Sequence, residues 1–328
     1  MKTETITILG LGRLGASVGL AIKASSLEVT IVGYEENRVL GRQAEEDLQA
    51  VDKVEWSLVK AAANADILVN TMPASQLESV MSVIGDQLQT HTLLIDLSGM
   101  KRLGLDLAKK HLTQGHYVGA VPVLPAVTLS DGRSDNMYAS ADHFRKGSFC
   151  LMPSPKADPK AVETAVNFGL LLGAQPFFLD PDEYDSLVQG TATLPGLSAA
   201  AMFKAIQKTA GWRDMLRFAG QEFAMSTMPL ESDVDIALQA LSSRQATLRW
   251  LDAVLEELQQ VRRWVYDGDE ELFSAYLSEI NYEREQWLGA REKNDWDERK
   301  TPEVKHRGFT EQMFGGLANA FKKDEDDE

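Results

Sequence analysis

The sequence is poor in cysteine and has no long apolar run, and both absences narrow the class of protein. Its 328 residues contain one cysteine, Cys150, so no disulfide can form within the chain. That is typical of proteins from a reducing cytosol. No apolar segment reaches the roughly 20 residues of a membrane-spanning helix, and the first ten residues, MKTETITILG, lack the pattern of a signal peptide. We therefore expect a cytoplasmic protein without a membrane partner.

Positive charge is also scarce. The chain has 33 lysines and arginines against 49 aspartates and glutamates, a net charge of −16. This balance disfavours nucleic acid as a partner. With 44% hydrophobic and 25% charged residues, the composition is that of a globular protein long enough for two domains with apolar cores.

The first half of the chain alternates short apolar runs with helix-like stretches. The runs are TITIL (5–9), VTIVGY (29–34), DILVNT (66–71), LLIDL (93–97), YVGAV (117–121), SFCLM (148–152) and PFFL (176–179). They are continuously apolar, as in strands covered on both faces. The pattern predicts an α/β fold, with a doubly wound parallel Rossmann-type sheet over residues 1–181.

The second half predicts helices only, as an all-helical domain over residues 182–289. One apolar stripe recurs at steps of three and four residues, formed by Leu248, Leu251, Leu255, Leu258, Val261 and Val265. The segment 199–206, AAAMFKAI, is apolar on most faces, so we expect it to be buried all round. So much apolar surface favours a homodimer through this domain over helices that pack only on their own sheet.

Residues 290–328 predict a charged, mobile tail. Within it, TEQMFGGLANAFKK (310–323) has the spacing of a short amphipathic helix, weakened by a Gly-Gly pair. The alternatives are that this segment docks on the body or a partner, or that it is a frayed end.

A glycine-rich loop follows the first predicted strand. Gly10, Gly12 and Gly15 have G-x-G-x-x-G spacing, and Arg13 and Leu14 complete the loop. The first glycine permits a tight turn, the second lets a pyrophosphate approach the backbone, and the third lets helix pack on strand. The N-terminus of the next helix then holds the phosphates. The loop predicts a dinucleotide-binding site.

Glu35 ends the second predicted strand, twenty residues after Gly15, where a carboxylate binds the adenosine ribose hydroxyls. Because a carboxylate repels the extra phosphate of NADP, we expect NAD as the cofactor. Arg38 and Arg42 lie near enough to hold that phosphate instead, so NADP stays open. The alternative is a Rossmann-like sheet that has lost its ligand.

Several motifs recur in the order and spacing of a known family. They are GLGRLGASVGLAIK, ADILVNTMP, LIDLSGMK, GAVPVLP, GSFCLMP, LGAQPFFLDPDEYDSLVQGTATLP and GWRDMLRFA. Over roughly residues 5–288 the chain resembles the prephenate and arogenate dehydrogenases. The resemblance implies oxidation of a ring carbinol by NAD or NADP with loss of carbon dioxide, on the route to tyrosine. It also implies a dimer formed by the helical domain, with the active site in the cleft between domains.

The resemblance fails at the family's proton acceptor. A histidine before proline accepts the carbinol proton in the family, and Val121 before Pro122 stands in its place here. The family's serine in the LIDLSGMK-like motif is replaced by Gly99, with Ser98 one position early and Lys101 kept.

Three further family histidines are absent. Two of them correspond to Thr193 and Gly196, and the third to Tyr184. Lys101, Ser98 and Tyr184 border the cleft that the resemblance implies, so they are the candidate catalytic residues.

The resemblance also implies a substrate-binding arginine at Arg217, with Arg213 one turn before it. Residues four apart share a helix face, so the two guanidinium groups would bind a small anionic substrate together. The alternative is a solvated face with local ion pairs.

Three functions stay open at this point. The first is a prephenate or arogenate dehydrogenase with a rearranged site. The second is a dehydrogenase of the same architecture for another small carboxylate. The third is a non-catalytic, NAD-binding dimeric sensor.

Overall fold

The computed structural model describes residues 3–129 and 135–296. Within these ranges eight strands form one sheet in the order β3-β2-β1-β4-β5-β6-β7-β8. The strands are β1 (Thr5–Leu9), β2 (Thr30–Tyr34), β3 (Lys53–Val54), β4 (Ile67–Asn70), β5 (Leu93–Asp96), β6 (His116–Val123), β7 (Ser148–Pro153) and β8 (Gln175–Phe178). The α/β class and the Rossmann-type topology are confirmed.

One pair of strands departs from the expected parallel sheet. Strands β6 and β7 are antiparallel, with Val121 opposite Cys150, whereas all other paired strands are parallel. A parallel pair needs a crossover, usually a long helix. The described part of the β6–β7 connection holds only the short α6 (Ala126–Leu129) and the 3₁₀ turn η3 (Asn136–Tyr138), so the chain turns back instead.

Alternate residues of the central strands pack into two apolar layers. Ile6 and Ile8 lie in the layer covered by α1 (Arg13–Ala24) and α7 (Pro159–Leu171). Leu9 lies in the opposite layer, under α3 (Leu58–Ala63), α4 (Leu77–Ile84) and α5 (Lys101–His111). Both faces of the central strands are therefore buried, which explains their continuously apolar sequences. The edge strand β8 differs from that expectation, because Phe177 and Phe178 are 41% and 55% exposed.

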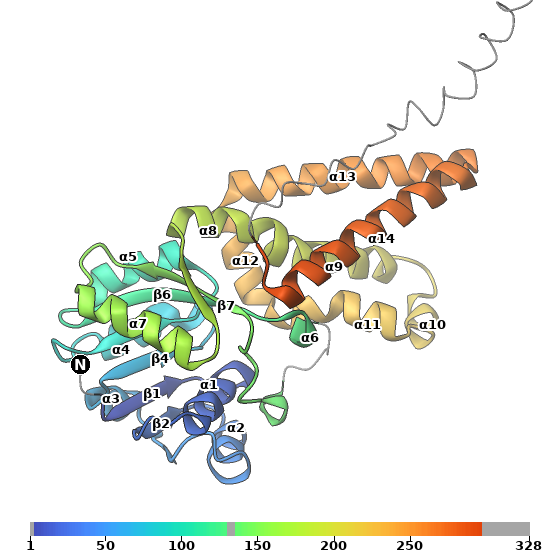
Figure 1. Cartoon of the computed structure of the whole chain (residues 1–328). Coiled ribbons are helices and arrows are strands. Elements are labelled where there is room, and N and C mark those ends of the chain that lie inside the picture. The colour runs from blue at the N-terminus through green and yellow to red at the C-terminus, as the bar shows by residue number, and fades with distance from the viewer. Residues whose placement is uncertain (1–2, 130–134, 297–328) are drawn as a thin grey trace, which may run out of the picture. The chain divides into compact units, whose positions relative to one another are not determined.

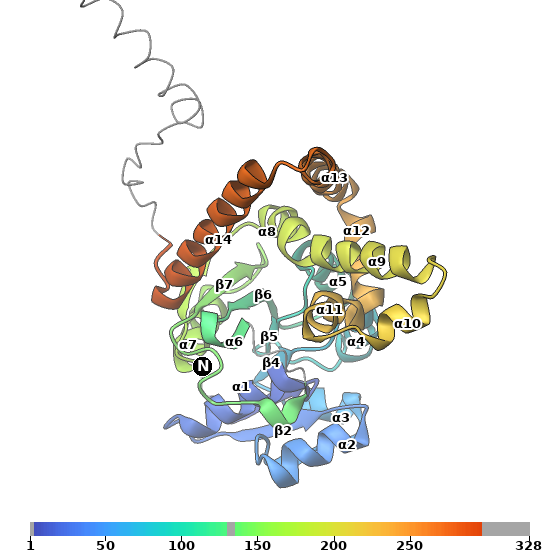
Figure 2. The same cartoon turned by 90° about the vertical axis from the view of Figure 1, so that its right-hand side faces the viewer.

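All described elements from Pro181 on are helical, and they gather at one side of the sheet (Figures 1 and 2). They are α8 (Pro181–Val188), the π-helical η4 (Gln189–Thr193), α9 (Leu194–Gln207), α10 (Trp212–Arg217), α11 (Gln221–Thr227), the 3₁₀ turn η5 (Met228–Ser232), α12 (Asp233–Ser242), α13 (Arg244–Asp267) and α14 (Glu270–Lys293). Within the described residues, no helix is both long and apolar enough to cross a membrane.

Two details differ from the expectations for this half. Segment 199–206 is not buried all round: only Ala199 is buried, and Met202 is 36% exposed, because α9 lies at the surface of the single chain. Helix α14 continues past residue 289 to Lys293. The helix expected at 310–323 lies outside the described residues, and the domain boundary near residue 181 stays a prediction.

Candidate functional site

The glycine loop between β1 and α1 has the backbone geometry that a dinucleotide site needs. Gly10 has φ +89°, a conformation that favours glycine. A Cβ at Gly15 would lie 1.9 Å from the Gly10 carbonyl oxygen, so a side chain there would separate helix from strand. A Cβ at Gly12 would meet nothing within 4 Å, so open space faces the backbone where a pyrophosphate would approach. Arg13 begins α1, and Leu14 packs against the core.

Glu35 is fixed beside this loop by two backbone groups. The Leu11 N–H donates to Glu35 Oε2 at 2.8 Å, and the Asn37 N–H donates to Oε1 at 2.9 Å. The carboxylate therefore lies at the end of β2 with free lone pairs for ribose hydroxyls. The Arg38 guanidinium lies over the Trp56 ring, 5.5 Å from its centroid. These residues fit a nicotinamide dinucleotide, either NAD or NADP.

A buried polar cluster is centred on Asp96, the last residue of β5. Its carboxylate accepts hydrogen bonds from Asn70 Nδ2 at 2.8 Å, Ser98 Oγ at 2.9 Å and the Tyr117 hydroxyl at 2.8 Å. Burial, together with the charge of Asp96, raises the pKa of Tyr117 well above its ordinary value. The Ser98 hydroxyl thus points inward to Asp96.

Lys101 begins α5 and is also turned inward. It is 1% exposed, and its Nζ donates to the Asp96 carbonyl oxygen at 2.7 Å. Burial lowers the pKa of Lys101, while the charges of Asp96 and Asp185 oppose that effect. A Cβ at Gly119 would lie 3.1 Å from Lys101 Cδ, so the lysine stem runs beside β6, two residues before Val121.

Asp185 on α8 caps the N-terminus of α5. Its two carboxylate oxygens accept the backbone N–H groups of Lys101 and Arg102, both at 2.9 Å. Neighbouring Tyr184 has its pKa raised mainly by burial, and the negative charges of Asp185 and Asp96 add to that effect. Tyr184 is therefore a neutral phenol near neutral pH. The structure brings Ser98, Lys101 and Tyr184 to the same buried region.

Val121 lies half-buried on β6, across from Cys150 on β7. Burial raises the pKa of the Cys150 thiol to about 11, so this thiol stays protonated near neutral pH. Neither side chain accepts a proton there. No group of three or more histidine, cysteine, aspartate or glutamate side chains in the described ranges is placed to hold a metal ion.

Helix α12 contacts the turns at the carboxyl ends of β4 and β5, and local sequence patterns do not predict these contacts. Asp235 Oδ1 accepts the Ser75 N–H at 2.9 Å, in the turn after β4. The Thr193 hydroxyl donates to Gln239 Oε1 at 3.1 Å, and a Cβ at Gly99 would lie 2.7 Å from Gln239 Nε2. The functional candidate that the sequence analysis missed is therefore Gln239, and the only local signal for it is the glycine at position 99.

A similar replacement occurs at Gly196 on α9. A Cβ at this position would lie 2.5 Å from Ile236 Cδ1, one turn before Gln239 on α12. Where the resemblance implies serine and histidine side chains at positions 99 and 196, side chains of α12 occupy the space.

Arg213 and Arg217 are not brought to the Asp96 cluster within one chain. Both are exposed on α10, and Arg213 lies over its neighbour Trp212 at 5.7 Å. Helix α10 follows the far end of α9 (Figures 1 and 2). Fourteen residues of α9 separate its two ends by about 21 Å.

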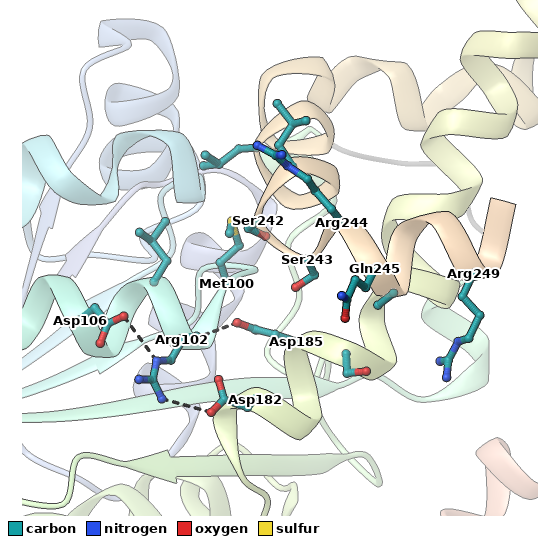
Figure 3. A pocket seen from close by; sticks show the side chains of 15 residues that line it. Met100, Arg102, Asp106, Asp182, Asp185, Ser242, Ser243, Arg244, Gln245 and Arg249 are labelled. Carbon is teal, nitrogen blue, oxygen red and sulfur yellow. Dashed lines mark hydrogen bonds and ion pairs between the residues drawn. The ribbon is translucent and has the colours of Figure 1, made fainter.

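A cavity of about 930 Å³ opens where α5 and α8 meet α12 and α13 (Figure 3). Arg102 lies between two carboxylates there, with its Nε 3.3 Å from Asp106 and an Nη 3.1 Å from Asp182. Arg244 and Arg249 line the opposite wall. The cavity borders Asp185 but not Lys101 or Tyr184, so it adjoins the α5 cap rather than the cluster itself.

Comparison with protein families matches residues 18–177 to the nucleotide-binding domain of prephenate dehydrogenase. The prephenate dehydrogenase of Bacillus subtilis is 25% identical over 298 residues, which cover 85% of this chain and 75% of the relative. The cyclohexadienyl dehydrogenase of Zymomonas mobilis is 22% identical over 275 residues, covering 80% of this chain and 90% of the relative.

Solved structures share the fold. The prephenate dehydrogenase of A. aeolicus, in complex with hydroxyphenyl propionate and NAD+, aligns with a TM-score of 0.71 at 19% identity, covering 87% of this chain and 99% of that one. The arogenate dehydrogenase of Synechocystis aligns with a TM-score of 0.62 at 17% identity, covering 86% and 99%.

Proposed function

Because the chain belongs to the prephenate and arogenate dehydrogenase family, we propose that it is an NAD-dependent dehydrogenase for a small anionic substrate of the prephenate and arogenate class. Both relatives are named as dehydrogenases, and the matches cover 75% and 90% of their lengths. They favour neither a dehydrogenase for an unrelated carboxylate nor a non-catalytic sensor.

The observation that carries the proposal is the nucleotide loop with its fixed acid. Gly12 leaves the backbone open to a pyrophosphate, and Glu35 is held at 2.8 Å from the loop by the Leu11 N–H. This arrangement supports NAD over NADP, since a 2′-phosphate would meet the Glu35 charge. NAD bound there would supply the hydride acceptor.

The remaining chemistry falls to the residues after β4, β5 and β6, because ligands of doubly wound sheets bind outside the carboxyl ends of the strands. Hydride leaves the ring carbinol carbon, the ring carboxylate departs as carbon dioxide, and the carbinol oxygen stays on the aromatic product. At Val121 no side chain accepts the carbinol proton. The buried Lys101 amine, whose pKa burial lowers, is the basic group beside that strand.

The substrate roles of Arg213 and Arg217 fit this proposal only in an assembly. Since α9 separates α10 from the Asp96 cluster in one chain, a second copy has to bring the arginines to the substrate. This agrees with the homodimer that we propose from the apolar helical surface.

The experiment is a steady-state assay of NADH formation with prephenate and with arogenate, combined with calorimetric titration of NAD and NADP. We expect NAD binding and slow, substrate-dependent NADH formation. If the protein bound neither NAD nor NADP, the result would contradict the proposal.

A further inference from the structure

Helix α12 presents two polar side chains, Asp235 and Gln239, to the carboxyl edge of the sheet. Asp235 fixes the helix to the turn after β4 through the Ser75 N–H, and Gln239, one turn later, lies over Gly99 in the turn after β5. Helix α12 therefore contacts both turns that border the region where a doubly wound sheet binds its ligands.

The Gln239 amide is oriented by one neighbour and leaves its donor unused. Thr193, fully buried in η4, donates its hydroxyl hydrogen to Gln239 Oε1 at 3.1 Å. That bond directs Nε2 toward Gly99. In the described part of the chain, Gln239 Nε2 donates to no protein acceptor.

The other polar groups at the end of β5 are already engaged. Ser98 donates to the Asp96 carboxylate, and Lys101 donates to the Asp96 carbonyl oxygen; both side chains are at least 96% buried, with exposed fractions of 4% and 1%. Gly99 adds no side chain. The Gln239 amide is thus the polar group that this edge leaves available to a ligand.

We propose that Gln239 is a substrate-binding residue, which donates from Nε2 to an oxygen of the small anionic substrate, and that Thr193 is its positioning residue. The inference rests on the proposed function and adds to it the group that holds the substrate over Gly99. A neutral amide suits this place, because a carboxylate there would repel an anionic substrate, whereas an amide offers two N–H donors.

The sharpest test is Gln239→Glu. It keeps the shape of the side chain and the oxygen that accepts from Thr193, but it removes the N–H donor and adds negative charge. Thr193→Val keeps the volume near that of threonine and removes the orienting hydroxyl. Gln245→Ala, on an exposed part of α13, is the matched control. Each full-length variant is titrated calorimetrically with NAD and then, with NAD present, with prephenate, arogenate and hydroxyphenyl propionate; KM and kcat are measured where turnover allows.

We expect Gln239→Glu to weaken binding of these acids by about 10- to 100-fold, the range for a hydrogen bond to a charged group. Thr193→Val should weaken it by a smaller factor, while NAD affinity stays unchanged in both and Gln245→Ala matches the wild type. If Gln239 has a purely structural role, Gln239→Glu will lower the melting temperature and leave acid binding unchanged. That result would overturn the inference but not the proposed function. Failure of the wild-type chain to bind any of the acids would overturn the proposed function together with the inference.

Discussion

At the scale of single residues, the proposed preference for NAD rests on Glu35. Its two carboxylate oxygens accept from the Leu11 and Asn37 backbone N–H groups, so the charge cannot swing away from an incoming ribose. Arg38, one of two nearby arginines, lies over the Trp56 ring. The local arrangement thus opposes a 2′-phosphate with a fixed charge.

We predict that NAD binds at least several-fold more tightly than NADP, measured by calorimetry on the wild-type chain. Glu35→Gln should reduce the difference in affinity between NAD and NADP, because it removes the charge that repels the 2′-phosphate while keeping the side-chain length. Equal or reversed affinities in the wild type would mean that Arg38 or Arg42 sets the preference.

Val121 is the second residue on which the proposed function depends. A placed general base contributes a factor of about 10²–10⁴ in rate, and a valine on β6 supplies none. We predict feeble prephenate turnover with intact NAD binding, measured as NADH formation and by calorimetry.

Val121→His should restore little of the lost rate. Gly99 and Gly196 bring no polar side chain to orient an imidazole, and Gln239 and Ile236 of α12 fill those places. Robust turnover by the natural chain would contradict this prediction and would direct attention to Lys101, to be tested by Lys101→Met.

At the scale of elements, the clearest link between the sheet and the helices is the cap that α8 places on α5. Asp185 accepts two backbone N–H groups at the start of that helix, and Asp182 pairs with Arg102 one residue further on. Asp185 is partly buried, whereas Asp182 and Arg102 are exposed, so we expect the Asp185 contacts to contribute more to stability than the ion pair.

The Asp185 cap gives a prediction about pH. Burial is the largest cause and raises the pKa of Asp185 above its ordinary value. As the pH rises above about 4, the carboxyl of the unfolded chain ionises first, so its contribution to stability falls until the pH passes the folded-state pKa. The free energy of unfolding of the wild type, relative to Asp185→Asn, should therefore decrease over that window.

Denaturant titrations at pH values from 4 to 8 measure how the free energy of unfolding changes with pH and so check this prediction. Asp182→Asn is the control, since an exposed pair with Arg102 contributes at most about 1 kcal/mol. A slope of the opposite sign would mean that the two N–H bonds, rather than burial, dominate the titration of Asp185.

Most elements follow from the sequence. The run TITIL coincides with β1, and the run LLIDL contains β5, because strands buried on both faces leave a continuous apolar signature. The two-residue β3 leaves too short a pattern to find. The antiparallel direction of β7 is also invisible locally, since it depends on the connection before the strand.

The candidate site follows from the sequence only in part. The glycine loop and Glu35 are local signals, with strand, turn and helix adjacent along the chain. Gln239 contacts Gly99, which lies 140 positions earlier in the chain, and no sequence periodicity indicates that contact. The inward orientation of Ser98 and Lys101 likewise depends on Asp96, whose burial only the folded sheet creates.

At the scale of the whole molecule, the single chain leaves a long apolar stripe in solvent. On α13, Leu248, Leu255, Leu258 and Val265 are each 54–64% exposed. Large contiguous apolar patches on a soluble protein mark interaction sites. Among the possible occupants, a second copy also accounts for the distance between α10 and the cluster that it is proposed to serve.

We therefore predict a homodimer at micromolar concentration, measured by light scattering, with the α13 stripe at its interface. Leu255→Glu should shift the equilibrium to monomer, because burying an unpaired carboxylate in an apolar contact costs more than such an interface returns. The control is Asp252→Asn, which removes a charge at an exposed position outside the stripe and should leave the dimer intact. If Arg217 serves the partner's site, the monomeric variant should also bind prephenate more weakly than the wild type while binding NAD equally well, because the nucleotide loop lies within one chain. A wild-type monomer in light scattering would contradict the assembly, and with it the substrate role of α10.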